Sequence, residues 1–203
     1  MHTENKDEMR DKILEAALKR FSQFGAGKTT MNEIADDIRC SKASLYYYFP
    51  DKNGLHAAVL DKVGELYFKG LEEAVANMTS ASVALRDLID IRQNFVKKFC
   101  RLELFKLLKN SPPAHFEQKM NEVKVKEAAL IEKMLEKGVK DGEFEEMNTV
   151  QVAELYNQVM IGLRFSALQG IPHLGEPTQD EFEIIIEKQK QLAQIFIKGI
   201  SKR

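Results

Sequence analysis

The sequence predicts an all-α protein in which an N-terminal three-helix head is joined by a long helix to a C-terminal helical bundle with a dimerisation face. Apolar residues recur at three- and four-residue steps in one segment after another, and residues that start or stop helices separate these segments. No window keeps up the alternation of apolar and polar residues that indicates a strand. With 203 residues, of which 44% are hydrophobic and 30% charged, the chain can bury a core of ordinary size.

The first helix is predicted over residues 7–24, and Gly25 suits the left-handed position that ends many helices. A short second helix is expected to begin at Thr30, because Thr30 and Glu33 have the spacing of a capping box. The inner faces of these two helices carry Ile13, Leu14, Ala17, Leu18, Phe21, Phe24, Ile34, Ala35 and Ile38.

A third helix is predicted over residues 42–49, with Ser41 as its N-cap and a proline directly after it. Leu45, Tyr48 and Phe49 fall at i, i+3 and i+4, so they share the face that points into the core.

A long fourth helix is predicted over residues 52–77, and Asp51 is placed to cap it. Its buried side is expected to hold Leu55, Val59, Val63, Leu66 and Leu71. Further amphipathic helices are predicted at about 82–100, 101–109, 114–140, 149–169 and 178–200.

The second and third helices, with a tight turn at Arg39 and Cys40, match the helix-turn-helix plan, in which the later helix enters the major groove of DNA. Residues 38–50 include no acidic residue, while Arg39 and Lys42 are basic, so this stretch can approach phosphate groups without repulsion. The overall charge does not indicate a DNA-binding protein, because the net charge is -1 and residues 1–52 hold nine basic and nine acidic residues. The argument therefore depends on where the charges lie within residues 38–50. The outer face of the third helix carries Ala43, Ser44, Tyr46 and Tyr47.

These motifs resemble the N-terminal signature of the TetR family of transcriptional regulators. The resemblance rests on Lys28-Thr29-Thr30, Ile34-Ala35 and the run from Ser41 to Lys52, SKASLYYYFPDK, and it covers about a quarter of the chain, residues 10–60. It implies an N-terminal helix-turn-helix domain over residues 1–52 and a ligand-binding and dimerisation domain over residues 53–203. The positions that match DNA-contacting positions of the family are Lys28, Thr30, Asn32, Lys42, Ala43, Ser44, Tyr46, Tyr47 and Lys52.

The sequence departs from the family pattern at the turn, where Arg39 and Cys40 replace the usual glycine and small aliphatic residue. Arg39 is then expected to adopt a left-handed backbone at a cost of about 1 kcal/mol. Alternatives are open at several positions: Arg39 and Lys52 contact phosphate or only solvent, and Tyr46 and Tyr47 contact DNA or pack within the protein. Cys40 is a small buried residue or a redox sensor.

The last two predicted helices each carry apolar residues on two faces, and a helix of this kind needs two packing partners. Two copies of the pair would form a four-helix dimer interface, which the family resemblance also implies. In the first of the two helices one face holds Val152, Leu155, Tyr156, Val159, Met160 and Leu163, and the other Ile161, Phe165 and Leu168. In the second, Phe182, Ile185, Ile186, Ala193, Phe196, Ile197 and Ile200 form one stripe, with Ile184 and Ile195 outside it.

A ligand site is expected within residues 60–170, mainly because the family resemblance implies one. Its apolar wall is drawn from Phe95, Phe99, Phe105, Phe116, Met120, Met134 and Phe144, for each of which core packing is the open alternative. The polar residues that are candidates to orient a ligand are Arg92, His115, Tyr156, Asn157 and Arg164.

Other classes of protein find little support in the sequence. Cys40 and Cys100 have no disulfide or zinc spacing, the four histidines have no metal-ligand spacing, and no catalytic constellation, cofactor loop or membrane span is evident. We therefore expect a non-enzymatic cytoplasmic protein without metal or cofactor. The leading hypothesis is a TetR-type homodimeric regulator, a repressor, that binds near-palindromic double-stranded operator DNA and responds to a small, mostly apolar effector. The alternative is a helical protein-binding adaptor whose helix-turn-helix does not bind DNA.

Overall fold

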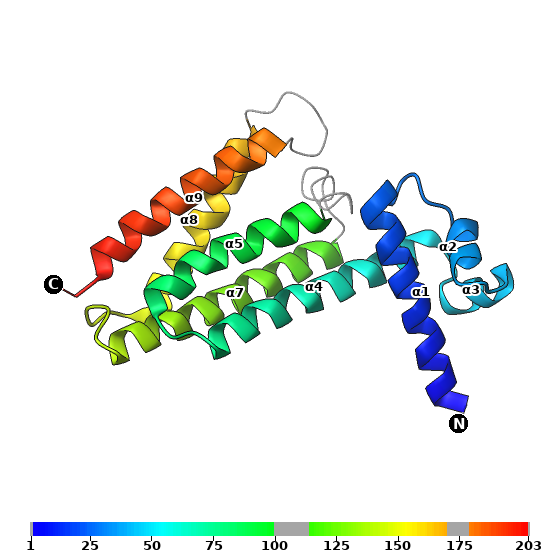
Figure 1. Ribbon diagram of the computed structural model, residues 1–203, viewed down its shortest axis with the longest axis horizontal. Coiled ribbons are helices and arrows are strands. Elements are labelled where there is room, and N and C mark those ends of the chain that lie inside the picture. Colours follow the sequence, from blue (N-terminus) through cyan, green and yellow to red (C-terminus); the bar gives the residue numbers. More distant parts are fainter. Residues whose placement is uncertain (1, 100–113, 170–178, 203) are drawn as a thin grey trace. The chain divides into compact units, whose positions relative to one another are not determined.

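The structure, a computed structural model, describes residues 2–99, 114–169 and 179–202, and this part of the chain forms eight helices (Figure 1). The predicted all-α class is confirmed, and the predicted helix at 101–109 lies outside the described residues. The helices are α1 His2–Phe24, α2 Met31–Asp37, α3 Lys42–Tyr48, α4 Lys52–Ala76, α5 Ala81–Phe99, α7 Ala114–Lys140, α8 Thr149–Gln169 and α9 Gln179–Ile200.

The described chain divides into two compact units. The first contains residues 2–68 and 96–99, and the second contains residues 69–95, 114–169 and 179–202. Helices α4 and α5 each contribute residues to both units.

The core of the first unit is made by the predicted apolar faces of α1 to α4. Helix α2 packs against both α1 and α3. The buried residues include Ile13, Leu14, Ala17, Phe21, Ile34, Ala35, Leu45, Phe49, Leu55, Val59 and Val63. Phe24, predicted on the inner face of α1, is instead 56% exposed, because it lies in the last turn of that helix.

Two further details of the first unit differ from the predictions. Helix α1 begins at His2, five residues before the predicted start at residue 7. On α4, Leu66 is 45% exposed, whereas Tyr67 is 9% exposed and takes the expected place in the core. The helical repeat explains the exchange, because Tyr67 continues the four-residue steps from Val59 and Val63 and Leu66 falls to the side of this stripe.

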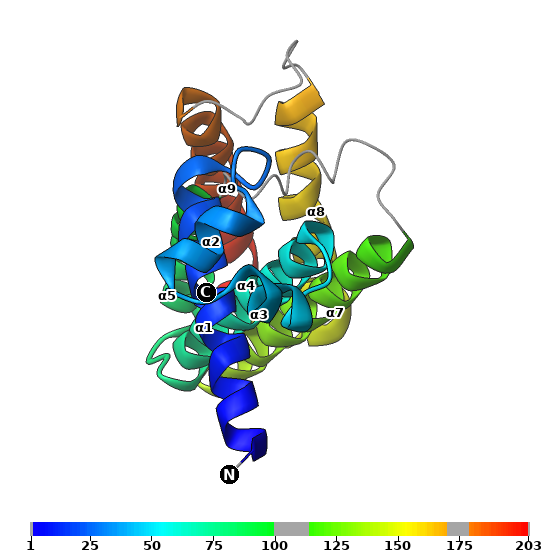
Figure 2. The ribbon, with the colours of Figure 1, turned by 90° about the vertical axis from the view of Figure 1, so that its right-hand side faces the viewer.

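In the second unit α7 packs along α8 and α8 packs along α9, as Figures 1 and 2 show from two directions. The connection between α7 and α8 turns at Gly142, whose φ of 76° is favourable for glycine. The same connection holds the end of α9, since Lys202 N donates to Glu143 O at 3.0 Å and Glu145 N donates to Ile200 O at 2.9 Å. The core residues include Leu85, Leu88, Ile89, Ile131, Met134, Leu135, Phe144, Ala153, Tyr156, Met160, Ile185, Ala193 and Ile197.

Candidate functional site

The start of α2 is fixed by the predicted capping box. Glu33 N donates to Thr30 Oγ1 at 3.3 Å, and Thr30 N donates to Glu33 Oε2 at 2.8 Å. These bonds satisfy backbone donors that the first turn of a helix leaves without intrahelical partners. The two residues therefore set the position at which the helix-turn-helix begins.

The turn between α2 and α3 has the predicted left-handed residue. Arg39 has a φ of 54°, and no other non-glycine residue in the described part of the chain has a positive φ. Cys40 N donates to Ala35 O at 3.0 Å, which closes the turn, and Ser41 then caps α3 by accepting from Ser44 N at 3.1 Å. The side chain of Arg39 is exposed.

Helix α3 presents one face to the core and the other to solvent. Leu45 and Phe49 are buried, whereas Tyr46 is 45% and Tyr47 69% exposed. Tyr48, predicted to be a core residue, is only half-buried, because α3 ends there and Phe49 beyond it fills the core. The Tyr48 ring lies edge-on to the Tyr47 ring with centroids 5.3 Å apart. Lys42 and Ala43 are exposed and Ser44 is half-buried.

The other predicted DNA-contacting residues lie at the beginnings of α2 and α4. Lys28, Thr30 and Asn32 are exposed, although the Thr30 hydroxyl already donates to Glu33 Oε2 at 2.8 Å. Lys52 is half-buried, and its Nζ donates to Gly27 O at 3.4 Å. This bond links the start of α4 to the loop before α2. All nine residues predicted to contact DNA lie within the first unit.

Two of the three acidic side chains of α2, Glu33 and Asp37, are paired with a cation that the sequence analysis did not single out. Arg20 of α1 forms a bidentate ion pair with Asp37, with Nε to Oδ2 at 2.6 Å and Nη2 to Oδ1 at 2.9 Å, and lies 3.3 Å from Glu33. The Arg20 hydrogen bond holds the pKa of Asp37 below its ordinary value, and the Thr30 backbone hydrogen bond does the same for the pKa of Glu33. A count of charged residues along the sequence does not show such ion pairs. The nine acidic residues counted within residues 1–52 therefore overstate the unbalanced negative charge near α3.

A buried polar cluster occupies the second unit. Arg92 of α5 is 3% exposed, and its Nη2 lies 2.8 Å from Glu127 Oε2 of α7 and 2.9 Å from Asn157 Oδ1 of α8. Asn157 Nδ2 in turn donates to Lys124 O at 3.0 Å. The sequence analysis named Arg92 and Asn157 but missed Glu127, which lies one turn before the buried Leu130 and Ile131 on the apolar stripe of α7 and was recognisable there as an acidic residue at a core position.

Tyr156 lies beside this cluster. It is 2% exposed, its ring centroid is 4.5 Å from that of Phe196, and its hydroxyl has no hydrogen-bond partner among the described residues. Burial raises the pKa of Tyr156 to about 12, even though the positive charge of Arg92 acts in the opposite direction. The hydroxyl therefore stays neutral at physiological pH.

The remaining predicted ligand residues are not brought together. Phe95 is half-buried in the second unit, and Phe99 is buried but belongs to the first unit. The side chains of His115 and Arg164 lie outside the described residues. Of the predicted polar set, the structure brings Arg92 and Asn157 into contact, and Tyr156 directly precedes Asn157 on α8.

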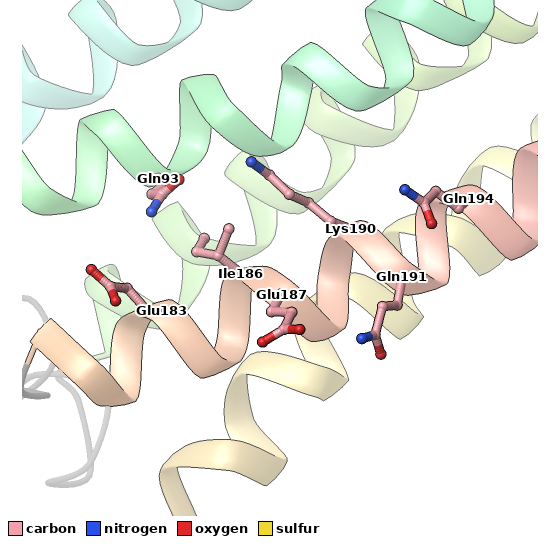
Figure 3. Close-up of a pocket in the computed structure, with 7 residues that line it drawn as sticks. All are labelled: Gln93, Glu183, Ile186, Glu187, Lys190, Gln191 and Gln194. Carbon is pink, nitrogen blue, oxygen red and sulfur yellow. The ribbon is translucent and has the colours of Figure 1, made fainter.

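A surface cleft of about 380 Å³ lies between α5 and α9 (Figure 3). It is lined by Gln93 of α5 and, on α9, by Ile186 and polar side chains from Glu183 to Gln194. None of the predicted ligand residues lines this cleft.

Apolar side chains are exposed on the last two helices. On α8, Leu155 is 58% and Val159 38% exposed, and on α9, Ile184 is 51% and Ile195 70% exposed. On α8 the exposed apolar residues come from the stripe that also holds Tyr156, and Ile161 of the second predicted face is half-buried. A stripe that includes both Leu155 and Tyr156 is too wide to be covered by one partner helix. One edge of it, at Tyr156, is buried in the second unit, and the other edge, at Leu155, is exposed.

Two other features bear on the hypotheses. Cys40 is half-buried, and burial raises the pKa of its thiol, which disfavours the reactive thiolate that a redox sensor needs. Cys100 lies outside the described residues. No helix in the described ranges is long and apolar enough to cross a membrane.

Comparison with known proteins supports the helix-turn-helix. Residues 13–59 match the family described as bacterial regulatory proteins, tetR family. The chain is 32% identical over 103 residues to the HTH-type transcriptional regulator RutR of Escherichia coli strain K12, which covers 49% of this chain and 48% of that protein. It is 42% identical over 48 residues to IcaR of Staphylococcus aureus strain Newman, a negative transcriptional regulator of the biofilm operon icaADBC, covering 24% of this chain and 26% of that protein. The matched part spans about half the length of the first of these relatives and a quarter of the second.

Solved structures extend the likeness to nearly the whole chain. A transcriptional regulator from Cytophaga hutchinsonii ATCC 33406 is similar with a TM-score of 0.85 and 29% identity, covering 94% of this chain and 97% of that one. A regulator from Saccharomonospora viridis, solved in complex with choline, shares the fold with a TM-score of 0.69 and 19% identity, covering 97% of this chain and 100% of that one. These relatives are named as transcriptional regulators, which agrees with the expectation of a non-enzymatic protein. Residues 13–59 thus match the DNA-binding part of the TetR family, and the fold of nearly the whole chain is that of solved transcriptional regulators.

Proposed function

We propose that the protein is a ligand-responsive transcriptional repressor that binds a near-palindromic operator as a homodimer. Residues 1–52 bind DNA in this proposal, and residues 53–203 bind the effector and dimerise. The observation that carries it is the outer face of α3, where Tyr46 and Tyr47 are exposed beside Lys42 with no acidic residue between Ile38 and Pro50.

The charge arrangement supports DNA binding in spite of the neutral head. Because Arg20 pairs with both Glu33 and Asp37, the acidic groups nearest in sequence to α3 are partly balanced before DNA arrives. Lys28, Lys42 and the backbone donors near the helix starts then meet phosphates, while the tyrosines meet sugars or base edges. The name of IcaR, a negative transcriptional regulator, supports repression rather than activation.

The exposed apolar residues of α8 and α9 support the homodimer. Leu155, Val159, Ile184 and Ile195 would be covered if two copies of these helices packed about a two-fold axis. A dimer presents two α3 helices, and two identical heads require a site with two-fold symmetry. The bacterial cytoplasm, where such DNA lies, is the proposed place of action.

The deciding experiment is fluorescence anisotropy with labelled DNA that flanks the protein's own gene, with an unrelated duplex as competitor. Binding at least a hundredfold tighter than to the unrelated duplex is expected, within the range of specific repressors. The Tyr47→Ala variant should lose this preference, whereas Lys133→Ala, an exposed lysine on α7, should keep it. If the protein shows no preference for any flanking duplex, the adaptor hypothesis replaces the repressor.

A further inference from the structure

The buried cluster of the second unit balances its own charge. Arg92 donates from Nε to Glu127 Oε1 at 3.2 Å as well as pairing through Nη2, and Asn157 accepts a further bond. All three residues are almost completely buried. A second charged group brought beside this pair would lose its hydration and gain no countercharge in exchange. The cluster therefore favours a neutral neighbour.

The hydroxyl of Tyr156 is a buried polar group of this region that the described residues leave without a hydrogen bond, and the same holds for one guanidinium nitrogen of Arg92, Nη1. A buried hydroxyl without a partner has lost its hydrogen bonds to water and gained none in return, so folded proteins seldom keep one without a function or a bound partner. Its surroundings are apolar on the side of Phe196, and Met160, one turn further along α8, is fully buried. A protonated phenol in such a place donates to an oxygen acceptor.

We propose that the effector is an uncharged, mostly apolar molecule whose carbonyl or hydroxyl oxygen accepts a hydrogen bond from Tyr156, beside the charge-balanced Arg92–Glu127 ion pair. This inference rests on the proposed ligand-responsive function and adds the chemical class of the effector to it. The aromatic ring of Phe196 and the side chain of Met160 contact the apolar part, and Tyr156 fixes the position of its oxygen.

Four probes with the same eight-carbon chain test the proposal: 2-octanone, 1-octanol, octanoate and octyltrimethylammonium. Thermal unfolding of the full chain is followed at increasing probe concentration, because a ligand that binds the folded state raises Tm. The ketone and the alcohol should raise Tm, and the carboxylate and the ammonium should need at least about tenfold higher concentrations for the same shift.

The Tyr156→Phe variant identifies the hydrogen bond. It should weaken 2-octanone binding about fivefold to tenfold, the equivalent of about 1–1.4 kcal/mol, and leave the Tm of the protein without probe equal or higher. A purely structural tyrosine would lower that Tm and leave the probe affinity unchanged. Tyr67→Phe, at a buried tyrosine of the first unit, is the matched control and should leave the affinity for 2-octanone unchanged.

Three results would overturn the inference: no probe binds, the charged probes bind as well as the neutral ones, or Tyr156→Phe binds 2-octanone as tightly as the unchanged protein. The last would mean that water or another part of the chain satisfies the hydroxyl. Operator binding without any probe is measured alongside, because its loss would count against the repressor itself, whereas intact DNA binding would limit the failure to the effector chemistry.

Discussion

The carboxylate of Glu143 accepts the backbone N–H of Ala81 at 2.8 Å, and so caps the first turn of α5 from the connection that follows α7. Ser82 N donates to the same carboxylate at 3.1 Å and Ser80 Oγ at 2.9 Å. Burial raises the pKa of Glu143, but the hydrogen bonds from Ser82, Ala81 and Ser80 outweigh it and lower this pKa to about 2. The Glu143 side chain thereby joins the connection between α7 and α8 to the connection between α4 and α5.

Replacing Glu143 with glutamine is expected to lower the free energy of unfolding by about 1–2 kcal/mol at pH 7, because two backbone donors of α5 lose a charged acceptor. A folded-state pKa lowered from 4.5 to about 2 means that the contribution of this carboxylate is complete above pH 4.5 and is lost as the pH falls towards 2. Urea unfolding between pH 3 and 7 measures both effects. Glu146→Gln, at an exposed residue of the same connection, is the control, and an equal loss in both variants would contradict the capping role.

The caps of α2, α3 and α4 were predictable because each lies next to its helix. Thr30, Ser41 and Asp51 all accept backbone N–H groups three residues later, as their positions in the sequence indicated. Glu143 was not predictable as a cap, because its partners lie 61 to 63 residues earlier and only the packing of α5 and α7 brings them together. Local capping rules therefore predicted the starts of α2, α3 and α4 but not the cap of α5.

Replacing Arg39 with glycine is expected to raise the free energy of unfolding by about 1 kcal/mol. The φ of 54° strains a residue with a Cβ atom, whereas glycine adopts this conformation freely. Arg39→Ala removes the same charge but keeps the Cβ atom, so it separates backbone strain from electrostatics. The midpoint of urea unfolding is the measurement, and equal midpoints for the two variants would show that the turn stores no strain.

Arg92→Met is expected to destabilise the protein by about 3–5 kcal/mol, because it leaves the carboxylate of Glu127 buried without its cation. The double variant Arg92→Met with Glu127→Leu should lose less than Arg92→Met alone, since no single charge then remains buried. Lys190→Met provides a comparison, because its ion pair with Asp90 is half exposed and should contribute less than about 1 kcal/mol. Chemical unfolding of the unchanged protein, Arg92→Met, Glu127→Leu and the double variant tests the coupling, and a loss in the double variant equal to the sum of the two single losses would contradict it.

The candidate effector residues show where sequence reasoning failed. Arg92, Tyr156 and Asn157 stood out as polar residues within apolar helices, and they do lie near one another. Phe95 and Phe99, four residues apart on α5, were expected to share one wall but fall in different units, because α5 continues from one unit into the other. The spacing of residues along a helix shows which of them share a face. It does not show which other helices pack against each part of that face.

Charged substitutions on the outer faces of α8 and α9 are expected to separate the proposed dimer. Leu155→Glu together with Ile195→Glu changes two exposed residues, so the fold of each protomer should survive. Ile197 and Phe196 are poorer choices, since Ile197 is only 8% exposed and the Phe196 ring packs on Tyr156.

Sedimentation velocity at micromolar concentration measures the outcome, with Val125→Glu on the exposed side of α7 as the control. Operator affinity should fall along with the dimer, because a single head loses the second half-site. An unchanged sedimentation coefficient in the double variant would place the contact between copies elsewhere.

Lys42 and Tyr47 are expected to affect DNA binding in different ways. Lys42 lies in the first turn of α3, where a lysine contacts phosphate, so Lys42→Ala should weaken binding to all sequences and reduce the slope of log affinity against log salt by about 0.9. Tyr47 is 69% exposed on the outer face of α3, one residue before the end of the helix, so Tyr47→Ala should change which operator is preferred.

Selection of binding sites from random duplexes tests both expectations together. The unchanged protein should select a near-palindrome whose half-sites lie about one helical turn apart or slightly more, because two identical heads must reach successive faces of the major groove. Lys42→Ala should select the same motif with lower affinity, and Tyr47→Ala a relaxed or altered one. If no two-fold symmetric motif is recovered, or if both variants lose affinity evenly over all sequences, α3 is not the recognition helix, and the exposed tyrosines would instead form a surface for a protein partner.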